Sequence, residues 1–236
     1  MISPLLANVC LHYVFDLWID QWRRTRARGD VVIVRYADDF VIGFEHEHAA
    51  RQCWEELKQR FAKFGLTLHP TKTRLLEFGR FAAVRRERQG AGRPESFDFL
   101  GFTHRCGKTR ASGRFQLIRT TIAKRMRATL AKIKEVLRRR MHWSLGEVGR
   151  WLRSVVQGWL NYYAVPDNSR RLSQFVDAVI KHWLRTLQRR SQTGRDRWTW
   201  PRMQRLARRY LPRPRILHPY PDPDARFRVR LEAGAV

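Results

Sequence analysis

Two adjacent carboxylates, Asp38 and Asp39, are the side chains of this sequence best suited to chemistry. Two negative charges this close repel each other unless a cation neutralises them. A divalent metal such as Mg²⁺ takes carboxylate oxygens, keeps several waters and bridges substrate phosphates, so the pair suits phosphoryl transfer by two metals. Asp-Asp is also ordinary turn chemistry, and for the pair taken alone a plain turn is the better interpretation.

The two carboxylates are positioned by the apolar segments on either side of them. Val31–Tyr36 and Phe40–Phe44 are rich in β-branched and aromatic residues, which predicts two strands. Ala37, Asp38 and Asp39 lie between these strands, where the connection is short. We therefore expect the carboxylates at the tip of a hairpin.

Helices are predicted on both sides of this hairpin. Ser3 and Pro4 are typical of a helix start, and the helix is expected to run to about Arg26. Helical spacing returns from about Glu47 to Phe64, and the following glycine ends that helix. The apolar positions of the first helix are Leu5, Leu6, Val9, Tyr13, Leu17 and Trp22.

Shorter segments follow the second helix. Thr67–Leu68 and Arg74–Phe78 resemble strands around a turn, and Phe97–Phe102 is a further β-like stretch. Arg85–Glu95 contains two glycines and a proline and is predicted to be a polar loop.

The rest of the chain has helical periodicity. Long amphipathic helices are predicted over Thr121–Arg140, Ser144–Ala164 and Ser169–Arg190, with a shorter one over Pro201–Tyr210. Such helices bury their apolar faces against one another, so we expect a helical bundle.

The formal net charge of +27 indicates a polyanionic partner. Residues 1–103 carry a net charge of only +3, whereas residues 104–236 carry +24. Arginine favours bidentate contacts with phosphate, although a GC-rich genome raises arginine content without any functional reason. The arginines expected to bind nucleic acid are Arg138, Arg139, Arg140, Arg170, Arg171, Arg189, Arg190, Arg208 and Arg209, and the aromatic rings expected to stack on bases are Trp143, Trp198, Trp200 and Tyr210.

The cysteines and the hydropathy exclude several classes of protein. Cys10, Cys53 and Cys106 stand alone, without the paired spacing of a zinc site or the even count of a disulfide framework. No apolar run reaches the roughly 20 residues that span a bilayer. We therefore expect a cytoplasmic protein without a membrane partner.

Four motifs in the first half resemble those of reverse transcriptases. Tyr36-Ala37-Asp38-Asp39 resembles the YADD motif, and residues 2–8 resemble the end of the PQG…SPLLAN motif. Residues 65–73 are similar to the next motif, and Phe97 with Leu100-Gly101-Phe102 is similar to the FLGF segment of the primer grip. The basic half resembles the thumb, or maturase domain X, of group II intron-encoded reverse transcriptases, most clearly over residues 158–163.

This resemblance implies an α+β fold with two domains. Residues 1–105 would form part of a right-hand polymerase palm, an antiparallel sheet with helices, and residues 106–236 an all-α thumb/maturase bundle. The implied activity is RNA-templated DNA synthesis with Mg²⁺, together with intron RNA binding for splicing and mobility. The implied partners are intron RNA, RNA template, DNA primer and dNTP, in a bacterial, nucleic-acid-associated protein of open oligomeric state.

The resemblance also implies roles for single residues. Asp38 would hold the catalytic metals with help from Asp39, and Tyr36 and Ala37 would lie against the primer end or the incoming nucleotide. Lys72 would lie near the triphosphate, unless it is a solvated lysine in a turn.

Other matching residues have supporting roles. Leu100, Gly101 and Phe102 would support the primer, with a plain packed strand as the alternative. Asn8 is expected to be structural, a helix residue that bonds nearby backbone.

The match to the family pattern is incomplete at the N-terminal side. Family members carry a third metal-binding aspartate and finger motifs upstream of the PQG segment, and Met1 falls inside that motif. Asp16 and Asp20 are predicted to lie on a solvated helix face and not to replace the missing aspartate. We therefore expect little DNA synthesis from residues 1–236 alone. A non-catalytic RNA-binding maturase module or a truncated inactive remnant remain as alternatives.

Overall fold

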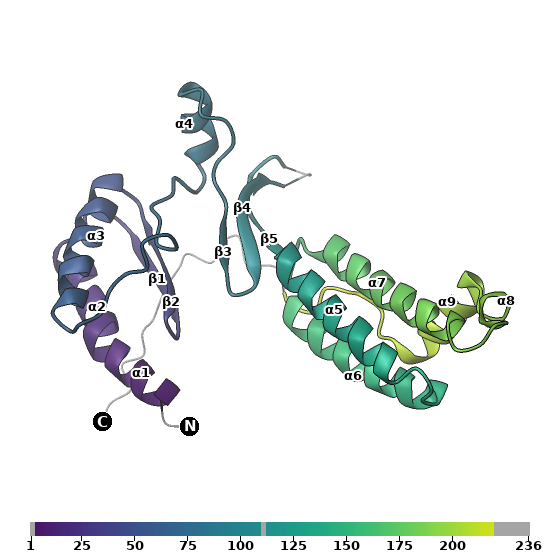
Figure 1. Ribbon diagram of the computed structural model, residues 1–236. Helices are drawn as coiled ribbons and strands as arrows, with labels where there is room; N and C mark the ends of the chain where they lie inside the picture. Colours follow the sequence, from purple (N-terminus) through teal and green to yellow (C-terminus); the bar gives the residue numbers. More distant parts are fainter. Residues whose placement is uncertain (1–2, 110–111, 220–236) are drawn as a thin grey trace. The chain divides into compact units, whose positions relative to one another are not determined.

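The computed structural model describes residues 3–109 and 112–219 (Figure 1). The chain divides into two compact units, Met1–Glu77 and Phe78–Val236, which we call the N-terminal unit and the C-terminal unit. Both helices and antiparallel sheets are present, which confirms the predicted α+β class. The predicted division into palm and thumb after residue 105 stays a prediction.

The N-terminal unit begins with one long helical segment, as predicted. It consists of α1 (Ser3–Leu11), a π-helical turn η1 (His12–Asp16) and α2 (Leu17–Thr25). The predicted hairpin follows as β1 (Val31–Tyr36) and β2 (Asp39–Phe44), and the helix α3 (Glu47–Ala62) comes next.

The core of this unit lies between the hairpin and the helices (Figure 1). Of the apolar positions predicted along the first helix, Trp22 is buried, whereas Leu5 and Tyr13 are exposed. The first helix buries a different set of side chains because these face α3 and the hairpin. The buried cluster comprises Val14, Phe15, Ile19, Trp22, Val31, Ala49, Cys53, Leu57 and Phe61.

Two strand predictions are wrong. Thr67–Leu68 and Arg74–Phe78 form neither strand nor helix. A strand needs a neighbour that accepts and donates its backbone hydrogen bonds, and within residues 3–77 the sheet contains only β1 and β2. Residues 66–78 instead are irregular around a turn at residues 70–72, with the Thr73 amide donating to the carbonyl of His69 at 3.0 Å.

The loop predicted over Arg85–Glu95 is also partly wrong, because a short helix α4 (Ala82–Arg88) occupies its first part. Alanine, arginine and glutamate are good helix formers, and the first glycine of this segment comes only at Gly90.

A three-stranded antiparallel sheet connects this helix to the bundle. It contains β3 (Phe97–Phe99), β4 (Phe102–Lys108) and β5 (Phe115–Thr121) in sequence order. The β-like stretch over residues 97–102 therefore comprises β3, a two-residue turn and the first residue of β4. Leu100 and Gly101 have φ angles of +47° and +81°, the left-handed conformation that a two-residue hairpin turn requires.

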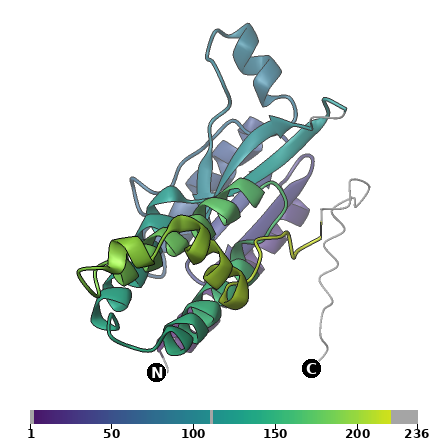
Figure 2. The same ribbon diagram turned by 90° about the vertical axis from the view of Figure 1, so that its right-hand side faces the viewer.

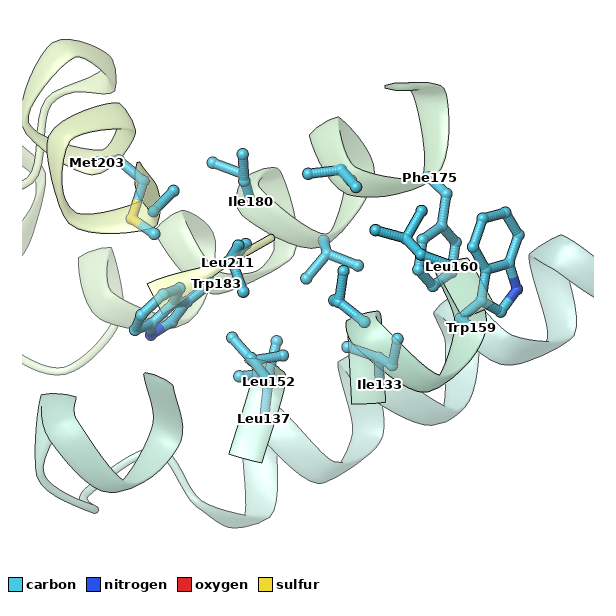
Figure 3. Packing of buried hydrophobic residues seen from close by; sticks show 14 of the residues in the cluster. Ile133, Leu137, Leu152, Trp159, Leu160, Phe175, Ile180, Trp183, Met203 and Leu211 are labelled. Atoms are coloured by element: carbon cyan, nitrogen blue, oxygen red, sulfur yellow. The ribbon is translucent and has the colours of Figure 1, made fainter. Parts of the chain in front are cut away.

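The predicted helical bundle is confirmed. Its helices are α5 (Ala123–Arg139), α6 (Leu145–Tyr163), α7 (Ser169–Gln188), α8 (Gly194–Arg197) and α9 (Trp200–Tyr210). Figure 2 faces these helices, and Figure 3 shows the apolar side chains that they bury.

Three large rings lie at two places in this core. Trp159 and Phe175 stack with their ring centroids 3.7 Å apart, and Trp183 is completely buried (Figure 3). Burial of a side chain of this size stabilises the bundle by roughly 2–3 kcal/mol. None of the described helices is long and apolar enough to cross a membrane.

Candidate active site and nucleic-acid interface

The two carboxylates lie at the tip of the β1–β2 hairpin, as the sequence predicts. Tyr36 pairs with Asp39 across the hairpin, which leaves Ala37 and Asp38 as a two-residue turn. Ala37 has a φ angle of +54°, an uncommon conformation for a residue with a side chain. All four residues are exposed, so their side chains can reach a ligand in solution.

The turn is held by Arg35, which sequence reasoning missed. Its guanidinium donates from Nε and Nη2 to the two carboxylate oxygens of Asp16, at 2.7 and 2.6 Å. Its Nη1 donates to the carbonyl of Ala37 at 2.8 Å and to Oδ1 of Asn8 at 3.0 Å. One arginine therefore ties the hairpin tip to the first helical segment.

The charges of this network reinforce each other. The hydrogen bonds that Arg35 donates to Asp16 raise the pKa of Arg35, although its partial burial acts in the opposite direction. The amide of Asn8 donates to the carbonyl of Pro4 at 3.1 Å, which confirms its predicted structural role and also orients its oxygen toward Arg35. Asp16, predicted to be a solvated acid, is an ion-pair partner in this network.

Replacing Arg35 by glutamine should lower the free energy of unfolding of the N-terminal unit by about 2 kcal/mol, because the charge-assisted bonds that Arg35 donates to two helix residues and to the turn are lost. We expect faster hydrogen exchange at the backbone amides of residues 37–40, measured by mass spectrometry. The matched control is Arg51→Gln, which removes an exposed i,i+4 ion pair with Glu47 and should cost less than about 0.5 kcal/mol. Equal effects of the two substitutions would contradict the positioning role of Arg35.

The donor set at the tip fits a hard cation such as Mg²⁺. Asp38 and Asp39 offer carboxylate oxygens, the ligands that Mg²⁺ prefers, and their exposure leaves room for water ligands. Among the described residues no group of three acidic, histidine or cysteine side chains could hold a metal ion. Asp38 and Asp39 would therefore supply some, but not all, of the ligands of a bound metal ion.

Lys72 belongs to the same unit as the two carboxylates. It is exposed, in the turn region that follows α3.

The three residues of the predicted primer support lie in the C-terminal unit. The Tyr162 hydroxyl donates to the carbonyl of Leu100 at 2.8 Å, and the ring of Phe102 stacks on Tyr162 at 5.8 Å. A Cβ atom at Gly101 would lie 3.0 Å from the hydroxyl oxygen of Tyr163. Glycine is therefore required here both by the turn and by the close approach of α6.

A basic groove of about 720 Å³ lies between α5 and α7. These two helices run side by side in the bundle (Figure 1). The groove brings together three of the predicted nucleic-acid-binding arginines, Arg138 and Arg139 from α5 and Arg189 at the C-cap of α7. Its other lining residues are Lys134, Glu135, Met141, His182, Arg185 and Thr186.

Two more of the predicted arginines make contacts beside this groove. The guanidinium of Arg140 lies over the rings of Trp143 and Trp151, at 4.3 and 5.0 Å from their centroids. Arg190 donates to the backbone carbonyl of Trp143 at 2.9 Å. These contacts fix the connection between α5 and α6.

The remaining predicted arginines lie at helix ends. Arg170 and Arg171 are in the first turn of α7, and Arg208 and Arg209 are in the last turn of α9. A cation near a helix C-terminus is favourable, whereas the N-terminus of α7 is a favourable place for an anion such as phosphate.

Of the aromatic rings expected to stack on bases, only Trp143 is exposed. Trp198 is buried in the core of the bundle, and Trp200 and Tyr210 pack against that core. The stacking prediction is therefore wrong for Trp198, because the segment that connects α8 and α9 folds back onto α7, where Gln188 donates to the Trp198 carbonyl at 2.9 Å.

The chain combines a hairpin that carries paired acidic residues at its tip with a basic helical bundle, which fits a nucleic-acid polymerase. Two family models match the chain. The model for reverse transcriptase (RNA-dependent DNA polymerase) matches residues 1–104, and the model for the group II intron, maturase-specific domain matches residues 126–215. The chain belongs to the group II intron reverse transcriptase/maturase family. No curated protein matches it.

Proposed function

We propose that Asp38 and Asp39 are the metal-binding carboxylates of RNA-templated DNA synthesis. The observation that carries this proposal is the exposed pair at a hairpin tip, held in place by Arg35 and Asp16. When bound, Mg²⁺ supplies Lewis-acid stabilisation of the phosphoryl group that is transferred. The chain itself supplies the two carboxylates and the network that fixes the turn.

Other residues that match the family motifs have complementary roles in this proposal. The ring of Tyr36, 66% exposed, provides a flat apolar surface against the primer end or the incoming nucleotide, beside Ala37. Lys72 neutralises charge on the triphosphate, and the turn at Leu100, Gly101 and Phe102 supports the primer.

The direct test is extension of a DNA primer on an RNA template in the presence of Mg²⁺. The chain is joined to the finger motifs and first catalytic aspartate of another family member, since the resemblance implies that these are needed. Mg²⁺-dependent extension supports the proposal, whereas a folded, RNA-binding fusion without extension contradicts it.

The C-terminal unit binds intron RNA in this proposal, and the groove between α5 and α7 contacts its phosphates. Arg138, Arg139 and Arg189 line the groove from two helices. Neutralised phosphates release counterions, so the affinity of such a site falls steeply with salt.

The double substitution Arg138→Gln/Arg189→Gln should lower RNA affinity about tenfold at moderate salt and reduce the slope of log affinity against log salt by about two. Fluorescence anisotropy with a labelled intron RNA fragment measures both quantities. The control Arg153→Gln/Arg205→Gln removes the same charge from exposed positions on α6 and α9, outside the groove. If the control weakens binding as much, the groove is not the contact site.

A further inference from the structure

One histidine lies inside the basic groove. His182 lines the groove from α7 and is half-buried there, whereas its neighbour Trp183 faces the core. The imidazole makes no hydrogen bond within the described residues, although the His182 backbone carbonyl accepts from the Thr186 hydroxyl at 3.0 Å. The lining of the groove therefore includes a polar ring that has no hydrogen-bond partner among the described residues.

Charged groups from both helices surround this ring. The cations are Lys134, Arg138 and Arg139 on α5, Arg185 on α7 and Arg189 at its C-cap. Among the described residues that line the groove, Glu135 is the only acid. Glu135 is paired with Arg139 one helical turn away, so its charge is already compensated. The surroundings of His182 therefore favour an anion.

Without a ligand, these surroundings oppose protonation of the ring. Burial lowers the pKa of His182, and the nearby charges of Arg185 and Lys134 lower it further. At neutral pH the free protein therefore holds a neutral imidazole among cations. An anion in the groove would have the opposite effect to these cations and would raise the pKa of His182.

We propose that a phosphodiester group of bound RNA enters this groove and is contacted by protonated His182, so that RNA binding takes up a proton at this residue. The proposal rests on the RNA binding proposed above and adds its coupling to pH. By linkage, a phosphate that raises the pKa of the histidine must bind more tightly when the histidine is protonated.

The direction of the pH effect follows from this linkage. Below the pKa of the free protein the ring is charged with or without RNA, and affinity is highest. Between the pKa of the free protein and the higher pKa of the complex, affinity falls as pH rises. Above both values the ring stays neutral and affinity is constant at its lowest level.

The experiment measures RNA affinity by fluorescence anisotropy from pH 5.5 to pH 8.5 at constant ionic strength. With a labelled RNA hairpin as the probe, the unchanged protein should bind about three- to tenfold more tightly at the acidic end, which corresponds to a pKa change of about half to one unit. His182→Gln should bind like the unchanged protein at pH 8.5 and should lack this increase. The control His142→Gln alters an exposed histidine of the same unit outside the groove and should keep the increase.

A second measurement does not depend on any variant. Histidine ring resonances of the ¹³C-labelled protein, titrated with and without the RNA hairpin, give the pKa of His182 directly, and a rise on binding supports the proposal. RNA binding with an unchanged pKa, or with the same pH dependence in His182→Gln, overturns it. Absence of RNA binding at every pH would instead overturn the proposed RNA-binding function itself.

Discussion

Replacing Asp38 by asparagine should reduce Mg²⁺-dependent primer extension about 1,000-fold in the fusion that carries the upstream motifs. The substitution keeps the size of the side chain and removes the negative charge that holds the cation. Metal stabilisation of a phosphoryl group is worth several kcal/mol, and each 1.4 kcal/mol changes the rate about tenfold. Single-turnover kinetics with a labelled primer measures the loss.

The affinity for RNA should change less than about twofold in the same variant, because the binding charges lie on the helices of the C-terminal unit. Asp30→Asn is the matched control, an exposed aspartate at the other end of β1, and it should retain full extension. Substantial extension by Asp38→Asn would show that Asp38 is an ordinary turn residue.

Replacing Asn168 by alanine should lower the free energy of unfolding of the C-terminal unit by about 3 kcal/mol. Asn168 is completely buried, and its Oδ1 accepts from the Thr121 amide at 3.0 Å. Its Nδ2 donates to the Thr121 hydroxyl at 2.7 Å and to the Tyr163 carbonyl at 2.8 Å. Alanine would remove these bonds and leave buried polar groups without partners.

Hydrogen exchange of the amides in α6 and α7 measures this loss for the C-terminal unit by itself. The control Asn161→Ala lies on the exposed side of α6, where its side chain accepts only from Gln157 in the described structure, and should cost less than about 0.5 kcal/mol. Similar protection in Asn168→Ala and the unchanged protein would mean that the buried network does not stabilise the unit.

The long helices and the hairpin could be predicted because the residue patterns that indicate them lie within short stretches of the sequence. The long helices of the bundle follow from apolar residues repeated at helical spacing, and the hairpin around Asp38 from β-branched residues on both sides of a short turn. The strands expected at Thr67–Leu68 and Arg74–Phe78 were not supported by a residue pattern of this kind. Short apolar runs become strands only when a neighbouring strand is available, which the local sequence does not reveal.

The residues that build the site were only partly predictable. The carboxylates could be predicted from a short motif, and most of the groove arginines from the clustering of positive charge. Both patterns involve residues that are neighbours in the sequence. Arg35 and Asp16 meet only because the first helix folds against the hairpin, and His182 meets Lys134 only because α5 packs on α7. Contacts between residues so far apart in sequence require the tertiary structure.

The bond from the Tyr162 hydroxyl to the Leu100 carbonyl has a consequence for the exchange of segments between related polymerases. It joins residues 62 positions apart, one in the FLGF turn and one near the end of α6. A recombination junction between β4 and α5 would separate these partners. The turn at Leu100 would then be combined with the α6 helix of another polymerase. A junction before Phe97 would transfer both together, so the turn and the helix are expected to evolve as one inherited module.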